Sequence, residues 1–140
     1  MRVFFDTNVY VAEALLGEGA QRIIRATLDA SWRIYTSSYV AAEAQRIISE
    51  KLGYSRRFAF LTRVRILRRA VAVEPSSARH VVPNDPADNL ILQAAIASGA
   101  DYLVTNDADL LELDPYEGMR IISMNGYLRV LENEGLLRYT

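Results

Sequence analysis

The chain has 140 residues, with 16 Lys or Arg against 17 Asp or Glu, so its formal net charge is −1. This length and a hydrophobic content of 51% predict one packed domain, residues 1–140, and exclude intrinsic disorder as the main state. With no Cys and a single His, the chain cannot hold a disulfide, a Cys-ligated zinc or a multi-histidine metal site.

Neither a membrane span nor a signal peptide is predicted. No stretch approaches the roughly 18 apolar residues that a span needs, and Asp6 stands where a signal peptide has its apolar centre. We therefore expect a cytoplasmic protein without membrane association. The charge is unevenly distributed, since six arginines and no acid lie between Arg56 and Arg69, whereas eight acids and no Lys or Arg lie between Val81 and Glu117.

In chain order, short apolar runs alternate with segments of helical spacing. The elements expected up to residue 74 are a strand at 3–5, helices at 9–16 and 20–30, a strand at 33–36, helices from Ser37-Ser38 to about 52 and at 55–72, and a short strand within 71–74. A loop follows, and then come a helix at 86–99 capped by Asp85, a strand at 102–104, a short helix at 110–111, a strand at 120–122 and a helix at 127–132.

The helix at 55–72 carries apolar residues at spacings of 4, 3 and 4, which predict one continuous buried stripe: Phe60, Val64, Leu67 and Val71. Arg65 and Arg69 are expected roughly opposite this stripe.

The expected strands are short apolar runs without polar alternation, which is typical of a parallel sheet buried between helical layers. The predicted fold class is therefore α/β. In such sheets the functional cleft lies beyond the carboxyl ends of the strands.

Five acids are candidates for this cleft. Asp6 and Asp107 follow two of the expected strands, Asp85 and Asp88 lie three residues apart at the start of a helix, and Glu43 lies early in another. Carboxylates within about 5 Å of one another repel by about 3 kcal/mol per pair at an effective dielectric near 20, so such a cluster requires protons or a cation. Oxygen ligands without Cys or a second His favour Mg²⁺ or Mn²⁺, which can support phosphodiester hydrolysis.

Four motifs carry a resemblance to the PIN-domain family, small metal-dependent ribonucleases that include the toxins of VapBC-type toxin–antitoxin pairs. The motifs span nearly the whole chain and are VFFDTN at 3–8, Glu43, DPADN at 85–89, and GADYLVTNDADLL at 99–111. The resemblance implies a three-layer α/β/α sandwich around a mainly parallel sheet, an RNA substrate, a small antitoxin partner and a homodimer.

The resemblance also implies an acidic quartet of Asp6, Glu43, Asp88 and Asp107. In this hypothesis Asp6, Asp88 and Asp107 hold Mg²⁺ or Mn²⁺, Asp109 supports the ion, and Glu43 places or deprotonates the attacking water. Asn8 and Thr105 match positions where the family has small polar residues beside the acids.

Each of these residues also has a purely structural interpretation. Asp6, Asp85 and Asp107 are suited to cap helices, Asp88 to interact with a helix dipole, and Glu43 to pair with Arg46. Arg65 and Arg69 are candidates for RNA contact, for a solvated helix face or for an acidic partner.

Two functions compete with the ribonuclease. One is an inactive PIN-like module that binds RNA or protein, and the other is a metal-dependent phosphatase of small molecules. The phosphatase ranks last because Asp6-Thr7-Asn8 lacks the second aspartate of the common aspartyl-phosphate loop.

Overall fold

A computed structural model of the protein describes residues 1–75 and 86–137. Five parallel strands form one sheet in the order β3-β2-β1-β4-β5. The strands are β1 (Arg2–Phe5), β2 (Arg33–Thr36), β3 (Val71–Ala72), β4 (Tyr102–Val104) and β5 (Arg120–Ile122).

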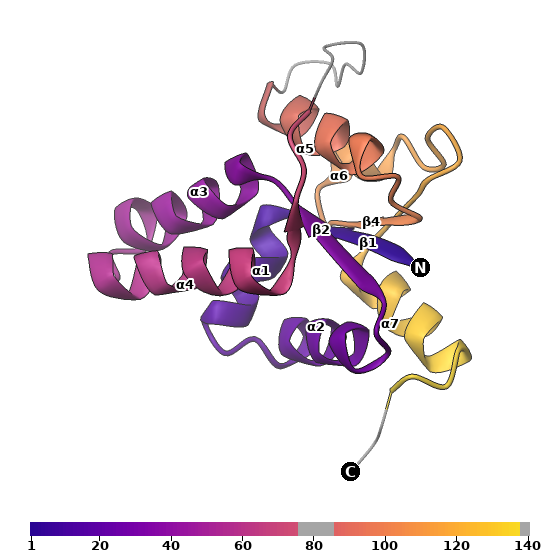
Figure 1. Ribbon diagram of the computed structural model, residues 1–140, viewed down its shortest axis with the longest axis horizontal. Coiled ribbons are helices and arrows are strands. Elements are labelled where there is room, and N and C mark those ends of the chain that lie inside the picture. Colours follow the sequence, from indigo (N-terminus) through magenta and orange to yellow (C-terminus); the bar gives the residue numbers. More distant parts are fainter. Residues whose placement is uncertain (76–85, 138–140) are drawn as a thin grey trace.

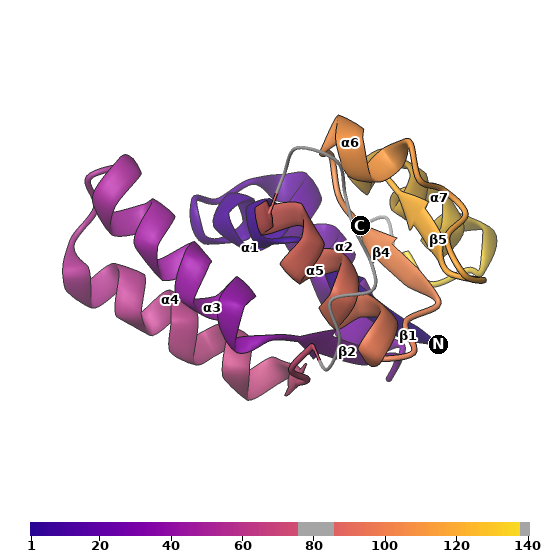
Figure 2. The same ribbon diagram turned by 90° about the horizontal axis from the view of Figure 1, so that it is seen from above.

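Helices cover both faces of the sheet. They are α1 (Thr7–Ala14), α2 (Glu18–Asp29), α3 (Ser38–Arg46), the π-helical η1 (Ile47–Lys51), α4 (Arg56–Arg69), α5 (Pro86–Ala97), α6 (Ala108–Leu111) and α7 (Met124–Asn133). Figure 1 shows α2 and α7 on one side of the sheet and α5 on the other, while α3 and α4 project together from one end in Figures 1 and 2. This arrangement confirms the predicted three-layer α/β/α fold.

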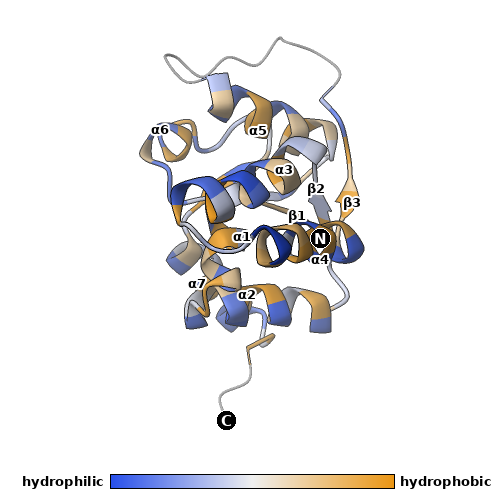
Figure 3. Ribbon diagram, turned by 90° about the vertical axis from the view of Figure 1, so that its left-hand side faces the viewer, coloured by the Kyte–Doolittle hydropathy of each residue, from blue (hydrophilic) through white to orange (hydrophobic). Residues whose placement is uncertain are grey.

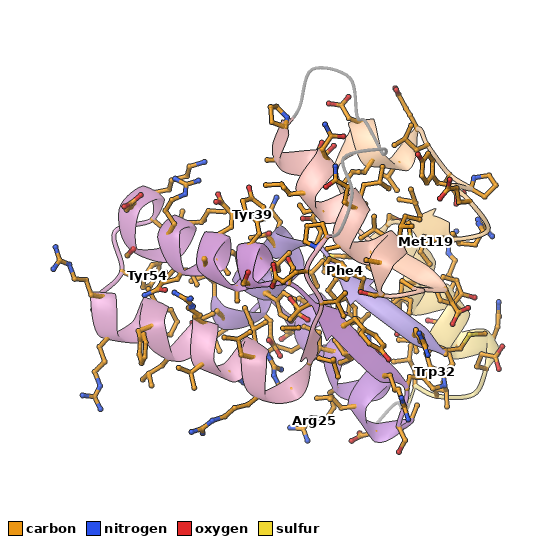
Figure 4. All side chains as sticks on the ribbon, turned by 45° about the horizontal axis from the view of Figure 1, so that its top comes forward. Phe4, Arg25, Trp32, Tyr39, Tyr54 and Met119 are labelled. Carbon is orange, nitrogen blue, oxygen red and sulfur yellow. The ribbon has the colours of Figure 1, made fainter. Side chains whose placement is uncertain are left out.

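The middle of the sheet is the most deeply buried part of the molecule. Val3, Phe4 and Phe5 of β1 have no exposed surface, because β2 and β4 flank this strand and helices cover its faces. Phe4 pairs in register with Tyr35 of β2 and Leu103 of β4, and Figure 4 shows it at the centre of the molecule. The lack of polar alternation in these strands reflects burial on both sides.

Every strand and helix expected from the sequence is present, and the differences are at their ends. The predicted helix that ends near residue 52 is α3 continued by the wider turns of η1, and Gly53 follows it with a φ of +74°. This left-handed conformation strains residues with a Cβ, which explains a glycine at the end of the helix. Pro86 is the first residue of α5, as predicted.

The predicted buried stripe of α4 is wrong. Phe60 is 53% exposed and Leu67 39% exposed, and Val71, at 55%, lies in β3 and cannot continue a helical stripe. The residues that α4 buries are instead Ala59, Thr62 and Ile66, with spacings of 3 and 4. Two of these three side chains, Ala59 and Thr62, are small, so the packed face of α4 is not the one with the most large apolar residues.

Within the described residues, no helix combines the length and the apolar character needed to cross a membrane.

Candidate active site

The strand order places two of the predicted acids beside each other. From β1 the sheet runs outward through β2 and β3 on one side, and through β4 and β5 on the other, so the order reverses between β1 and β4. Chain segments leave such a switch point toward opposite faces and open a crevice at the carboxyl ends of the two strands. Asp6 directly follows β1, and Asp107 lies three residues beyond the end of β4.

Two hydrogen bonds hold the side chain of Asp6, which is only 4% exposed. Its Oδ1 accepts a hydrogen bond from the backbone N–H of Thr7 at 2.6 Å, so the side chain caps α1. Its Oδ2 accepts a hydrogen bond from Thr105 Oγ1 at 2.7 Å, and the same hydroxyl accepts one from the backbone N–H of Asp107 at 3.0 Å. Thr105, predicted as an auxiliary residue, therefore links the two acids across the switch point.

Asp107 caps the short helix α6. Its Oδ1 accepts hydrogen bonds from the backbone N–H groups of Asp109 at 2.9 Å and Leu110 at 3.3 Å. The capping interpretation of both Asp6 and Asp107 is thus confirmed. It does not compete with the active-site hypothesis, because capping also fixes the direction of each carboxylate, and a carboxylate has two oxygens with several acceptor positions.

Three acids have carboxylate oxygens close enough to share one ion. One oxygen from each of Asp88, Asp107 and Asp109 lies within 4.8 Å of the other two. Asp88 is in the first turn of α5 and only 5% exposed, Asp107 is half-buried and Asp109 is exposed. Hard divalent cations bind carboxylate oxygens and retain water at open positions, so this donor set fits Mg²⁺ or Mn²⁺.

Two of the predicted acids, Asp6 and Glu43, are not part of this group of three. The Glu43 carboxylate accepts hydrogen bonds from Nε and a terminal nitrogen of Arg46, the structural alternative considered for it. The pair raises the pKa of the Arg46 guanidinium through the hydrogen bond and charge of Glu43. Asn8 is exposed in the first turn of α1. Asp85 lies outside the described residues.

The sequence did not reveal the partner of Arg69. Its guanidinium donates two hydrogen bonds of 2.7 Å to the buried carboxylate of Glu13, and Arg65 lies 3.6 Å from the same carboxylate. Burial lowers the pKa of Arg69, and the bonds to Glu13 outweigh this effect and raise it. In the sequence, Glu13 is the only acid in the apolar run 9–16, which indicates a buried carboxylate. A buried carboxylate needs a compensating partner such as a cation, but the sequence does not show that this cation is Arg69.

The fold and the acids define a small α/β domain with a carboxylate cluster at the switch point of a parallel sheet. A family model described as PIN domain matches residues 2–109. The chain therefore belongs to the PIN domain family.

Among solved structures, the chain is similar to VapBC2 from Rickettsia felis bound to a DNA fragment from their promoter, with 20% sequence identity and a TM-score of 0.65. The likeness covers 88% of this chain and 98% of that chain, and at this identity it supports the fold. No curated protein matches the chain.

Proposed function

We propose that the chain is an endoribonuclease that hydrolyses RNA phosphodiester bonds with Mg²⁺ or Mn²⁺ in the cytoplasm. The observation that carries this proposal is the approach of the Asp88, Asp107 and Asp109 carboxylates to within 4.8 Å. Three negative charges so close together repel unless a cation or protons balance them. Membership of the PIN domain family supports the same chemistry.

Asp88, Asp107 and Asp109 would hold the ion, with Asp6 as a further ligand, directly or through water. When bound, a divalent ion stabilises negative charge on a phosphate and activates water. Thr105 holds the Asp6 carboxylate by its 2.7 Å hydrogen bond, and capping of α6 holds Asp107. We retain Glu43 as the residue that places or deprotonates the attacking water, which requires it to release Arg46, and Asn8 and Asp85 as auxiliary residues.

The test is cleavage of single-stranded RNA with Mg²⁺, with Mn²⁺ and with chelator. Asp88→Asn and Asp6→Asn keep the side-chain shape and remove a charge, so each should lower the rate at least about 100-fold. Glu112→Gln is the control, because Glu112 is an exposed acid three residues beyond Asp109. Cleavage that survives both aspartate substitutions, or that does not need a divalent ion, would refute the proposal.

We also propose that the chain is the toxin of a toxin–antitoxin pair and forms a homodimer. The support is the likeness of its fold to VapBC2 from Rickettsia felis. Expression of the chain should arrest growth, and co-expression of its antitoxin, to be sought as a small protein encoded beside its gene, should restore growth. Asp88→Asn should be harmless without an antitoxin. Sedimentation of the purified chain tests whether it forms a dimer.

One observation favours the alternative of an inactive binding module. Glu43 binds Arg46 and does not join the cluster of Asp88, Asp107 and Asp109. If the module is correct, RNA or a protein should bind without turnover at any Mg²⁺ or Mn²⁺ concentration. In that case Arg65, which is 59% exposed, is better placed for RNA contact than Arg69, whose side chain is 18% exposed and bound to Glu13.

A further inference from the structure

The apolar stripe of α4 has no partner among the residues that the structure describes. Phe60, Val64 and Leu67 are separated by 4 and 3 residues, so they follow one side of the helix. Phe60 and Leu67 are 53% and 39% exposed, and Val64 is half-buried. This apolar stripe lies on the outer side of the pair formed by α3 and α4, since α4 packs on its neighbours through Ala59, Thr62 and Ile66.

Arginines border the apolar stripe on both sides. At about 100° per residue, Arg56 and Arg63 fall on one side of it, and Arg57 and Arg68 on the other. The helix has no acid from residue 56 to 69. Within the described residues, Arg63 donates to Gln45 at 3.1 Å, and no ion pair joins any of these four arginines to an acid. In Figure 3, where α3 and α4 are in front, α4 carries both orange and deep blue residues.

This charge pattern distinguishes the possible occupants. A second copy packed along the same stripe would bring arginines against arginines, which is unfavourable once water is excluded. A nucleic acid would match the arginines and could stack a base on Phe60, but base stacking prefers aromatic side chains, which Val64 and Leu67 lack. An amphipathic helix with an apolar stripe between acidic margins matches both the apolar and the charged parts.

A second arginine-rich surface has less unbalanced positive charge than the outer side of α4. A hollow of about 630 Å³ beside α2 and α4 is lined by four arginines, including Arg25, but also by Glu13 and Glu18. Its own acids partly neutralise it, and Glu13 already binds Arg69. The unbalanced positive charge thus lies along the outer side of α4.

We propose that the outer side of α4 binds an acidic amphipathic helix of a partner protein. Phe60, Val64 and Leu67 contact the apolar stripe of that helix, and the bordering arginines pair with its Asp and Glu residues. The proposal does not depend on nuclease activity, because none of the residues involved belongs to the acidic cluster.

The probe is a synthetic fluorescein-labelled helical peptide as long as α4, with leucines along one stripe and glutamates on both margins. Two control peptides have lysines in place of the glutamates or the same residues in scrambled order. We expect the acidic peptide to bind the full chain in fluorescence anisotropy with an affinity that falls as salt rises, and the controls not to bind.

Four variants locate the binding site. Leu67→Gln should weaken binding about tenfold by removing apolar contact, and Arg57→Gln combined with Arg68→Gln should weaken it to a similar extent. Leu28→Gln and Arg25→Gln are matched controls, because Leu28 is 37% exposed and both residues line the other hollow. The controls should leave binding unchanged. All these positions are exposed, and thermal unfolding of each variant checks that it folds.

Several outcomes would overturn the proposal. The acidic peptide does not bind at concentrations up to about 100 µM, or Leu67→Gln binds it as tightly as the natural chain does. A third such outcome is that the control variants weaken peptide binding as much as Leu67→Gln does. A dimer of the chain that Leu67→Gln dissociates would show that a second copy covers the stripe. Tight binding of an oligouridine that depends on Arg57 and Arg68 but not on Leu67, with no peptide binding, would assign the surface to nucleic acid.

Discussion

The buried hydroxyl of Thr105 makes two hydrogen bonds through one oxygen. It donates to the Asp6 carboxylate and accepts from the backbone N–H of Asp107, so it connects the residues that follow β1 and β4. From the sequence, Thr105 was only a small polar residue near the acids. Its role depends on the pairing of two strands about 100 residues apart in the chain, which brings Asp6 beneath it.

Replacement of Thr105 by Val keeps the shape of the side chain and removes the hydroxyl. We expect the free energy of unfolding to fall by about 1–3 kcal/mol, because the buried Asp6 carboxylate and the backbone N–H of Asp107 lose this partner. Thr105→Ser keeps the hydroxyl and should retain the hydrogen bonds. Denaturant unfolding of the three proteins measures the difference, and equal stability of Thr105→Val and the natural chain would contradict the expected role.

Asp114 gives the protein a pH-dependent contribution to stability. The pKa of its carboxyl is lowered by the hydrogen bond and charge of Arg120 and by the backbone N–H of Ile121, against a smaller opposing effect of burial. A carboxyl with a lowered pKa in the folded state stabilises the fold above its ordinary pKa of about 4, and this stabilisation disappears as the pH falls through the folded-state value. Asp114→Asn should therefore lower stability at pH 7 and flatten the loss of stability in acid. If urea unfolding shows that Asp114→Asn and the natural chain lose the same stability between about pH 5 and pH 2, this assignment is wrong.

At the scale of elements, packing determines which side of α4 is buried. Two residues next to each other in sequence differ sharply, since Ile66 is 1% exposed and Leu67 is 39% exposed. Periodicity alone showed that Phe60, Val64 and Leu67 share one side of the helix, but it did not identify which side of the helix faces the protein. The position of α3 decides this, and the pair of Arg69 and Glu13 further fixes α4 against α1.

Alanine substitutions at these two neighbours test the orientation of α4. Ile66→Ala should lower the free energy of unfolding by about 2–5 kcal/mol, because it leaves a cavity in the core. Leu67→Ala should change it by about 0.5 kcal/mol or less, as for other exposed positions. Thermal or denaturant unfolding compares the two variants, and a larger loss for Leu67→Ala would mean that α4 is rotated.

At the scale of the whole molecule, we expect the acidic cluster to couple ion binding to folding. Asp88 lies in α5, Asp107 caps α6 and Asp109 lies in α6, so the three converge only when the sheet and its helices have assembled. An unfolded chain has no such cluster, so an ion that binds it stabilises the folded state. The gain is about 2.7 kcal/mol when the ion concentration is about 100 times the Kd.

We therefore expect Mg²⁺ or Mn²⁺ to raise the melting temperature by several degrees relative to chelator. Asp88→Asn should lose most of this rise, because it removes one of the three charges that would hold the ion. Differential scanning calorimetry measures both effects. A melting temperature that does not respond to divalent ions in the natural chain would count against a metal site in the cluster.

The sequence by itself determined the fold class, the order of the strands and helices along the chain, and the residue types of the candidate site. Short unalternating apolar runs require burial on both sides, and Gly53 and Pro86 mark helix ends through their backbone chemistry. Such signals act over a few residues, so a single sequence contains them in full.

Only the tertiary structure decided which acids share a site, which side of α4 is buried and which cation Glu13 meets. Asp88 joins Asp107 and Asp109, whereas Glu43 remains paired with Arg46, and Glu13 finds Arg69 across 56 positions. These outcomes depend on distances between segments that are remote in the chain. Local propensities do not determine such distances, because they arise from the packing of the helices against one another and on the sheet.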